Sequence, residues 1–382
     1  MILVNGVPLL EGTAGVARHA RAAVAAIERG PHANETEIWL PSALAPSAGA
    51  IQAGSNLPIR IYPGPHPRRG FSFNQIFWTH CLAWHRCRHF RHAHVFSPIE
   101  TYSALPLGHP LITAHDCYAD HFGDPARGGR TGRGRKLCVR QLRRSRVLAV
   151  SRFTAAELET LHALSGPQVL TVPNWLPREF ETQPDSAQIE SVRMKLNLPP
   201  RFWLYCGGFR GNKNLPLLLR AYAATLARIP ETPPLVLAGR WPESDTVYTG
   251  PLNTVLAGLG ERVAGRILRP GFIAEESLPS LYRLAELAIC PSSYEGFGYP
   301  VIEAAAVGTP LLAARAASLP EIWPHPELLF SPDDPAELTA LLDRAALQGT
   351  SFAARELSPD SLYPEGEKRF HAALESWLGD KS

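Results

Sequence analysis

Two glutamates and two glycines in one short segment are the residues of this chain best suited to bind and activate a substrate. Glu295 and Glu303 are separated by seven residues, and Gly296 and Gly298 lie between them. Carboxylates accept hydrogen bonds from sugar hydroxyls, and glycines allow a backbone to approach a ligand closely. Amides at a helix start attract phosphate. The segment therefore predicts a nucleotide-sugar site.

The surrounding residues indicate which elements position these groups. Residues 286–290 form a short apolar run typical of a buried strand, and Pro300 favours the first turn of a helix. The loop would then lie at the carboxyl end of a parallel strand, where doubly wound folds bind ligands. Taken alone, the same pattern also allows Glu303 to complement only the helix dipole and Glu295 to lie in a solvated turn.

A second glycine-rich loop, residues 205–214, carries Arg210 and Lys213 between an apolar strand and a helical pattern. Fixed cations at this place would stabilise the negative charge of a departing nucleoside diphosphate. The alternative is that both side chains project into solvent from a turn.

The N-terminal half contains two weaker signals. Gly12 and Gly15 precede an alanine-rich helical pattern, and the pair His115-Asp116 follows a predicted strand. A histidine there can hydrogen-bond a substrate and exchange protons near neutral pH. By themselves, the glycines are also explained by packing and the His-Asp pair by a polar turn.

The spacing of Glu295 and Glu303 resembles the E-x7-E signature of retaining glycosyltransferases, specifically glycosyltransferase family 4 with its GT-B fold. Further similar stretches follow in the family's order, and together they span nearly the whole C-terminal half: Gly271-Phe272, 278–285, 308–314 and 319–322. Weaker matches in the N-terminal half are 12–15, 113–116, 150–154 and 172–174.

The resemblance implies an α/β protein with two Rossmann-like doubly wound domains that face each other across a cleft. It implies retaining transfer of a hexose to a glycan or a lipid-linked glycan, with GDP-mannose as the first donor to consider. In the family the donor phosphate accepts the acceptor's proton. No aspartate pair with D-x-D spacing stands beside the site, so we expect neither a catalytic metal nor a cofactor besides the nucleotide sugar.

The resemblance also implies roles for individual residues. Glu295 would contact the donor sugar and Glu303 the ribose, while Lys213 and, as a replacement, Arg210 would neutralise the diphosphate, since Gly208 stands where many family members have arginine. The remaining implied contacts are His115 with the donor sugar or the acceptor hydroxyl, Gly15 with the donor phosphates, and the backbone of Gly296, Phe297 and Gly298 with the sugar.

Length and periodicity predict the domain organisation. A chain of 382 residues with 45% apolar residues suffices for two cores, and two series of strands alternate with helical patterns. We expect an N-terminal domain over residues 1–185 and a C-terminal, nucleotide-sugar-binding domain over 186–364. The family resemblance implies that a last helix, about 365–382, packs back onto the first domain.

Composition limits the partners and the compartment. The net charge of +3 gives no reason to expect nucleic acid, and the six cysteines form no C-x-x-C pair. Residues 1–10 predict a strand rather than a signal peptide, and no apolar stretch is long enough to span a bilayer. We expect a cytoplasmic protein.

A run of nine basic residues without an acid, from Arg127 to Arg146, would attract anionic lipid or a lipid-linked pyrophosphate. With aromatic residues nearby it predicts peripheral attachment to the inner face of the cytoplasmic membrane; these are Phe71, Phe73, Phe77, Trp78 and Trp84. The alternatives are a solvated arginine face with buried aromatics or, for the whole protein, an inactive GT-B scaffold on membranes or nucleic acid.

Overall fold

A computed structural model describes residues 1–10, 15–52, 54–62, 94–99, 110–122, 133–246, 249–355 and 365–379. The chain divides into two compact units, one formed by Met1–Trp175 with Tyr363–Ser382 and the other by Leu176–Leu362. The chain passes between the units at Trp175 and Leu176, whereas the sequence placed the boundary near residue 185.

The first unit is built on a parallel sheet with the strand order β3-β2-β1-β4-β5-β6-β7. All residues of β1 and β5 are buried, as expected for a parallel sheet with both faces covered. The strands are β1 (Ile2–Asn5), β2 (Thr36–Pro41), β3 (Ile59–Tyr62), β4 (His94–Ser97), β5 (Leu111–Ala114), β6 (Arg146–Ala149) and β7 (Val169–Thr171).

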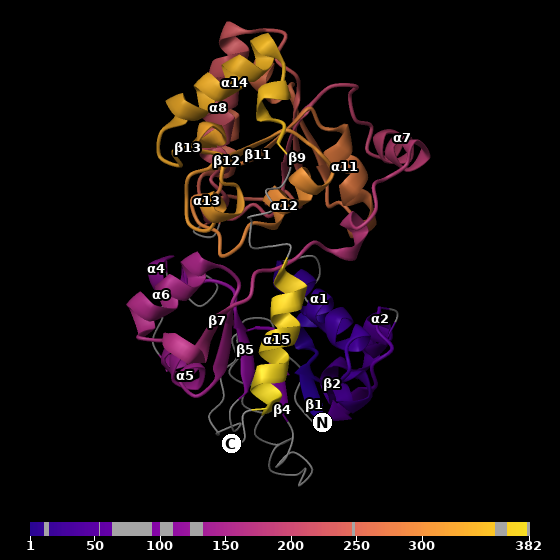
Figure 1. The fold of residues 1–382 in the computed structure, drawn as a ribbon. Coiled ribbons are helices and arrows are strands. Elements are labelled where there is room, and N and C mark those ends of the chain that lie inside the picture. Colours follow the sequence, from indigo (N-terminus) through magenta and orange to yellow (C-terminus); the bar gives the residue numbers. More distant parts are fainter. Residues whose placement is uncertain are drawn as a thin grey trace. The chain divides into compact units, whose positions relative to one another are not determined.

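Helices cover this sheet, and the last helix of the chain is one of them. The helix α15 (Gly366–Gly379), yellow in Figure 1, lies against α1 (Gly15–Arg29). Its apolar side, with Phe370 and Leu374, joins the core of the first unit. The other described α-helices of this unit are α2 (Ala48–Gln52), α4 (Tyr118–Phe122), α5 (Arg133–Leu142) and α6 (Arg152–His162).

The second unit has a parallel sheet with the order β10-β9-β8-β11-β12-β13. Its strands are β8 (Trp203–Cys206), β9 (Leu235–Ala238), β10 (Ile267–Gly271), β11 (Leu287–Cys290), β12 (Leu311–Ala314) and β13 (Leu329–Phe330). The helices are α7 (Ser186–Lys195), α8 (Leu215–Arg228), α9 (Leu252–Gly258), α10 (Glu261–Ala264), α11 (Leu278–Leu284), α12 (Tyr299–Ala306), α13 (Leu319–Ile322) and α14 (Pro335–Gln348), of which α8 and α14 pack side by side (Figure 1).

Both sheets reverse their strand order at one point, between β1 and β4 in the first unit and between β8 and β11 in the second. At such a point the loops after the two strands diverge, and their carboxyl ends form the usual ligand site of doubly wound sheets. The predicted α/β fold with two Rossmann-like sheets is confirmed. No described helix combines the length and the apolarity needed to cross a membrane.

Candidate active site

An ion pair lies at the reversal point of the second sheet. The Lys213 ammonium, in the loop after β8, is 2.5 Å from Oε1 of Glu295, in the loop after β11. The side chains of Lys213 and Glu295 are 20% and 11% exposed, so the pair is largely shielded but still reachable from solvent. Two residues that are far apart in the sequence and were both predicted to bind the donor are thus in direct contact.

The surroundings of the Glu295 carboxylate are polar on one side and buried on the other. The Ser292 hydroxyl donates a hydrogen bond of 2.7 Å to Oε1, the oxygen that also contacts Lys213. Burial and, second, the negative charge of Glu295 raise the pKa of Cys290 to about 12, and the same two causes hold the pKa of Tyr205 well above its usual range. The carboxylate therefore imposes its charge on a weakly solvated neighbourhood, where electrostatic interactions are strong.

Hydrogen bonds fasten the two loops together. The Asn212 side-chain amide donates to the carbonyl of Tyr294 at 2.8 Å, and the backbone amide of Ser293 donates to the carbonyl of Asn212 at 2.8 Å. Asn214 follows with φ of 52°, which ends the short turn and starts α8. The ion pair consequently stands on a fixed backbone, which reduces the reorganisation that a reaction would require.

A third loop supports the segment from Glu295 to Gly298. The Ser318 hydroxyl, in the loop after β12, lies 2.9 Å from the carbonyl of Glu295 and 2.6 Å from that of Phe297 and shares its hydrogen between them. Gly298 has φ of +115°, and a Cβ there would lie 2.7 Å from Leu319 Cδ2. Any other residue would be strained at this φ and would displace Leu319, and α12 begins at the next residue.

Glu303 is buried within the second unit, in contact with α11. It is 1% exposed, and the Tyr282 hydroxyl of α11 donates to its Oε2 at 3.0 Å. Phe297 is 5% exposed and packs edge-on against Tyr299, while Gly296 is also buried. The ribose contact of Glu303 and the sugar contacts of the three loop residues remain predictions.

Arg210 lies at the exposed start of the turn Gly211–Lys213. The loop before it is held by Tyr205, whose hydroxyl donates to the carbonyl of Gly208 at 2.5 Å. Arg210 therefore belongs to the same loop as Lys213, and its action as a replacement for an arginine at Gly208 stays a prediction.

His115, predicted from the first unit, belongs to a buried polar network. Its Nε2 lies 2.8 Å from the carbonyl of Pro98, and its ring stands edge-on to His19 with 5.0 Å between centroids. His19 Nδ1 lies 2.7 Å from Asn174 Oδ1, and its Nε2 lies 3.0 Å from the Thr113 hydroxyl. The network joins α1, β5 and the loops after β4 and β7.

Burial sets the charge of these histidines. His19 is 1% exposed, and desolvation followed by the nearby His115 lowers its pKa to about 3. Desolvation also lowers the pKa of His115, opposed by its contact with Pro98 and by Asp116. Both rings are therefore neutral near pH 7. The contact of His115 with the donor sugar or the acceptor hydroxyl stays a prediction.

The remaining predictions for the first unit are only partly described. Gly15 is the first residue of α1, Gly12 lies outside the described residues, and Asp116 accepts a bond of 3.0 Å from the amide of Tyr118 at the start of α4. Arg127, Arg130 and the aromatic residues from Phe71 to Trp84 also lie outside the described part.

Known proteins share both the architecture and the second unit. Among solved structures, Anabaena Alr3699/HepE in complex with UDP and glucose superposes with a TM-score of 0.69 at 17% identity, covering 98% of this chain and 97% of that chain. WaaG, a glycosyltransferase involved in lipopolysaccharide biosynthesis, gives 0.65 at 15% identity, covering 96% and 92%. With its two sheets, the protein therefore has the GT-B fold.

Sequence comparison shows what the second unit is similar to. Residues 200–346 match the family described as "Glycosyl transferases group 1". Serotype-specific mannosyltransferase WbdA of Escherichia coli is 28% identical over 220 residues, which are 56% of this chain and 26% of the relative. O-antigen chain mannosyltransferase B of Escherichia coli is 31% identical over 202 residues, 51% of this chain and 49% of the relative.

The second unit is thus similar to the group 1 glycosyltransferases over residues 200–346, in agreement with the resemblance predicted from the E-x7-E spacing. The alignments span about half or less of the length of these two curated relatives. The region that matches the family model, residues 200–346, includes the loops of Lys213 and Glu295.

Proposed function

We propose that this protein transfers a hexose, with mannose as the first candidate, from a nucleotide diphosphate sugar to a glycan or lipid-linked glycan acceptor. The observation that carries this proposal is the contact of Lys213 and Glu295 at the reversal point of the second sheet, directly before the start of α12. A cation, a carboxylate and a helix start at one place suit a sugar bound to a diphosphate.

In this proposal the donor diphosphate competes with Glu295 for the ammonium of Lys213. The amides at the start of α12 add a favourable field for the phosphates. Glu295, relieved of part of its contact with Lys213, accepts hydrogen bonds from the sugar hydroxyls while Ser292 keeps the carboxylate oriented. Binding of the donor thus exchanges one ion pair for another.

The transfer proceeds with retention at the anomeric carbon. The bond from this carbon to the diphosphate oxygen breaks, and the acceptor oxygen bonds to the same face. The leaving phosphate takes the proton of the acceptor hydroxyl, so no protein nucleophile takes part. Lys213 stabilises the negative charge that develops on the diphosphate, and orientation of both substrates supplies the remaining acceleration.

The choice of mannose rests on the names of the relatives. Besides the two Escherichia coli mannosyltransferases, an MMP alpha-(1->4)-mannosyltransferase of Mycolicibacterium hassiacum is 42% identical over 98 residues, 25% of this chain. HepE, in contrast, was solved with UDP and glucose and with UDP-glucose. Its identity to this chain, 16–17%, shows only that the fold is shared. GDP-mannose is therefore tested first and UDP-glucose beside it.

The test measures release of nucleoside diphosphate from GDP-mannose, GDP-glucose, UDP-glucose and ADP-glucose, with mannosyl and glucosyl oligosaccharides and polyprenyl-diphosphate glycans as acceptors. We expect GDP-mannose to be consumed fastest and the new linkage to have the α configuration by NMR. Lys213→Ala should slow release on the order of 100- to 1000-fold, whereas Lys368→Ala, at an exposed lysine of α15, should not change it. Faster consumption of another donor would make its sugar, and not mannose, the transferred hexose. Absence of turnover with every donor and acceptor would favour the inactive GT-B scaffold.

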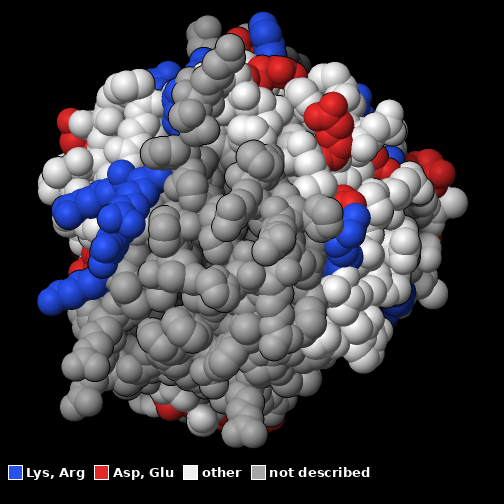
Figure 2. Space-filling model, turned by 90° about the horizontal axis from the view of Figure 1, so that it is seen from below, with Lys and Arg blue, Asp and Glu red and all other residues white. Residues whose placement is uncertain are grey.

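The basic segment supports a second element of the proposal, attachment to an anionic membrane surface. In the described part, the buried side of α5 includes Cys138 and Leu142, while Lys136, Arg140, Arg143 and Arg144 are exposed at or just after the helix. Figure 2 shows lysine and arginine side chains gathered on the left of the face seen from below, the side on which α5 lies in Figure 1. Since the apolar side of α5 is used by the core, the attraction to lipid would be electrostatic.

Vesicle sedimentation tests this attachment. The protein should bind phosphatidylglycerol vesicles and not phosphatidylcholine vesicles, and binding should fall with salt. Replacing Lys136, Arg140 and Arg144 by glutamine should weaken binding on the order of 100-fold, at about 1 kcal/mol per charge. Binding that is equal on both vesicles, or unaffected by the triple substitution, would contradict the attachment.

A further inference from the structure

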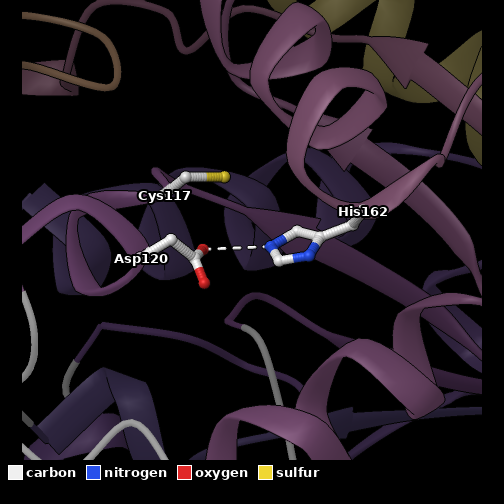
Figure 3. Close-up of side chains that lie close together, drawn as sticks. All are labelled: Cys117, Asp120 and His162. Carbon is white, nitrogen blue, oxygen red and sulfur yellow. Dashed lines mark hydrogen bonds and ion pairs between the residues drawn. The ribbon is translucent and has the colours of Figure 1, made fainter.

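Three metal-ligating side chains converge in the first unit, in a place that the glycosyl transfer does not use. Cys117 lies in the turn between β5 and α4, Asp120 belongs to α4, and His162 is the last residue of α6. One ligand atom of each residue, the sulfur, a carboxylate oxygen and a ring nitrogen, lies within 4.8 Å of the other two. Figure 3 shows Asp120 and His162 facing each other, with the sulfur of Cys117 beside them.

The two supports of this cluster are fixed by the backbone. The amide of Asp120 donates to the carbonyl of Cys117 at 2.9 Å, so both side chains lie on the same side of one turn. The helix α6 is capped at its start by Ser151 and ends directly after His162, because Ala163 adopts φ of 53°. The Thr154 hydroxyl of α6 also reaches the carbonyl of His115, at 3.4 Å.

Burial and charge favour a cation here. Cys117 is fully buried in the apolar cluster of Ile112, Leu142 and Leu158, while the side chains of His162 and Asp120 are only 10% and 14% exposed. Nε2 of His162 lies 3.0 Å from Oδ2 of Asp120, a position that a metal ion can take in place of a proton. A thiolate and a carboxylate together balance the charge of a divalent cation, with the imidazole neutral.

We propose that Cys117, Asp120 and His162 bind a zinc ion. Thiolate, imidazole and carboxylate are the ligands that zinc takes in proteins, whereas magnesium and calcium require oxygen ligands. Ligand atoms around a tetrahedral zinc lie about 3.4–3.8 Å apart, given its bond lengths. The cluster therefore closes on the ion with side-chain movements of about 1 Å, and a water molecule takes the fourth position.

The ion would join the carboxyl end of β5 to the end of α6. His115 directly follows β5, and Cys117 is two residues further along the chain. Zinc would therefore fix the turn that carries His115 and stabilise the first unit. This structural role is separate from the glycosyl transfer proposed for the second unit.

The experiment uses the metal-free chain and titrates cobalt, which reports a thiolate ligand by its charge-transfer absorption. Zinc is then added in competition. Residues 80–92, outside the described part, contain histidines and cysteines, which are residue types that can also bind cobalt. The titration is therefore carried out with the Cys81→Ser/Cys87→Ser variant, so that these two thiolates do not contribute to the absorption. We expect one cobalt ion per chain with thiolate absorption, displaced by one zinc ion.

Single substitutions assign the ligands. Cys117→Ser should remove the absorption, and Asp120→Asn or His162→Gln should weaken zinc binding on the order of 100-fold or more, since even outer contacts of a zinc site affect affinity by about 10–100-fold. Cys138→Ala, in the same apolar cluster, should change neither, and circular dichroism of the metal-free variants verifies the fold. Absence of cobalt binding, or absorption that persists in Cys117→Ser, would overturn the site.

Discussion

The reversal points of the two sheets carry different chemistry on the same topology. In the first unit the network around this point consists of His19 and His115, which burial keeps neutral. In the second unit it carries the ion pair of Lys213 and Glu295, which retains partial exposure. Equal strand order therefore fixes where a site lies, while the local sequence fixes whether the site offers charge or neutral hydrogen bonds.

The difference follows from what surrounds each group. His19 projects from the buried side of α1 between Thr113 and Asn174, so its ring is fully desolvated and both nitrogens have partners. Lys213 and Glu295 project from loops, where they keep contact with water and need only each other and Ser292. A charged diphosphate suits the second arrangement, and an uncharged hydroxyl suits the first.

The largest effect should come from Lys213→Ala. If the second unit supplies the charge that stabilises the departing diphosphate, kcat should fall on the order of 100- to 1000-fold, as for loss of one strong stabilising group. Steady-state kinetics with the preferred donor measures it. Lys368→Ala, at an exposed lysine, is the matched control for Lys213→Ala. Glu231→Ala, at an exposed glutamate, is the matched control for Glu295→Ala. A loss below tenfold in Lys213→Ala would remove the contrast between the two sites.

His19→Ala should destabilise the first unit by about 2–4 kcal/mol, because it leaves a cavity and removes the partners of two buried polar groups. Urea unfolding, with hydrogen exchange at the amides of β1 and β5, measures this loss. His32→Ala, at a partly exposed histidine paired with Glu375, should cost far less. Equal losses in both variants would mean that the His19 network contributes nothing beyond packing.

Gly298→Ala should cost about 1–3 kcal/mol in the second unit, because alanine is strained at positive φ and its Cβ meets Leu319. Two controls separate the causes: a Cβ at Gly308, with φ of +74°, or at Gly258, in α9, meets nothing within 4 Å. We expect the order Gly298, Gly308, Gly258 in thermal unfolding. If Gly298→Ala were as stable as Gly258→Ala, neither the positive φ nor the contact with Leu319 would require glycine at position 298.

The stability of the first unit should depend on pH through the buried His19. His19 has a pKa of about 3 in the folded protein and about 6.5 unfolded, so below pH 6.5 the unfolded state binds the extra proton. Stability from this residue is complete above pH 6.5 and falls by about 1.4 kcal/mol per pH unit below it. Between pH 6.5 and 5 wild type should lose about 2 kcal/mol more than His19→Gln. Parallel losses would show that folding does not lower the pKa of His19.

Much of the fold followed from the sequence, because strands buried on both faces produce short apolar runs. The runs at 111–114 and 287–290 are strands β5 and β11. The short strands β7 and β13 cannot be predicted in this way, since three and two residues leave no periodic pattern. The sequence predicts that Lys213 and Glu295 belong to one site, because each lies in a loop after an apolar strand. These strands, β8 and β11, are neighbours in the sheet.

Other features depend on contacts that spacing does not encode. Nothing in the alanine-rich pattern of α1 marks His19 as a member of a polar network, because its partners lie 94 and 155 residues away. Ser318 and Ser292 have no distinctive pattern, and the burial of Glu303 against Tyr282 depends on how α11 packs on α12. The cluster of Cys117, Asp120 and His162 likewise arises only when α4 meets the end of α6.

Isothermal titration of Lys213→Ala and wild type with a nucleoside diphosphate and the matching monophosphate tests the central claim most directly, because only the diphosphate carries the group proposed to replace Glu295 at Lys213. The account predicts that the substitution weakens the diphosphate at least tenfold and leaves the monophosphate nearly unchanged. Equal weakening of both nucleotides, or of neither, would contradict the assignment of Lys213 to the leaving diphosphate.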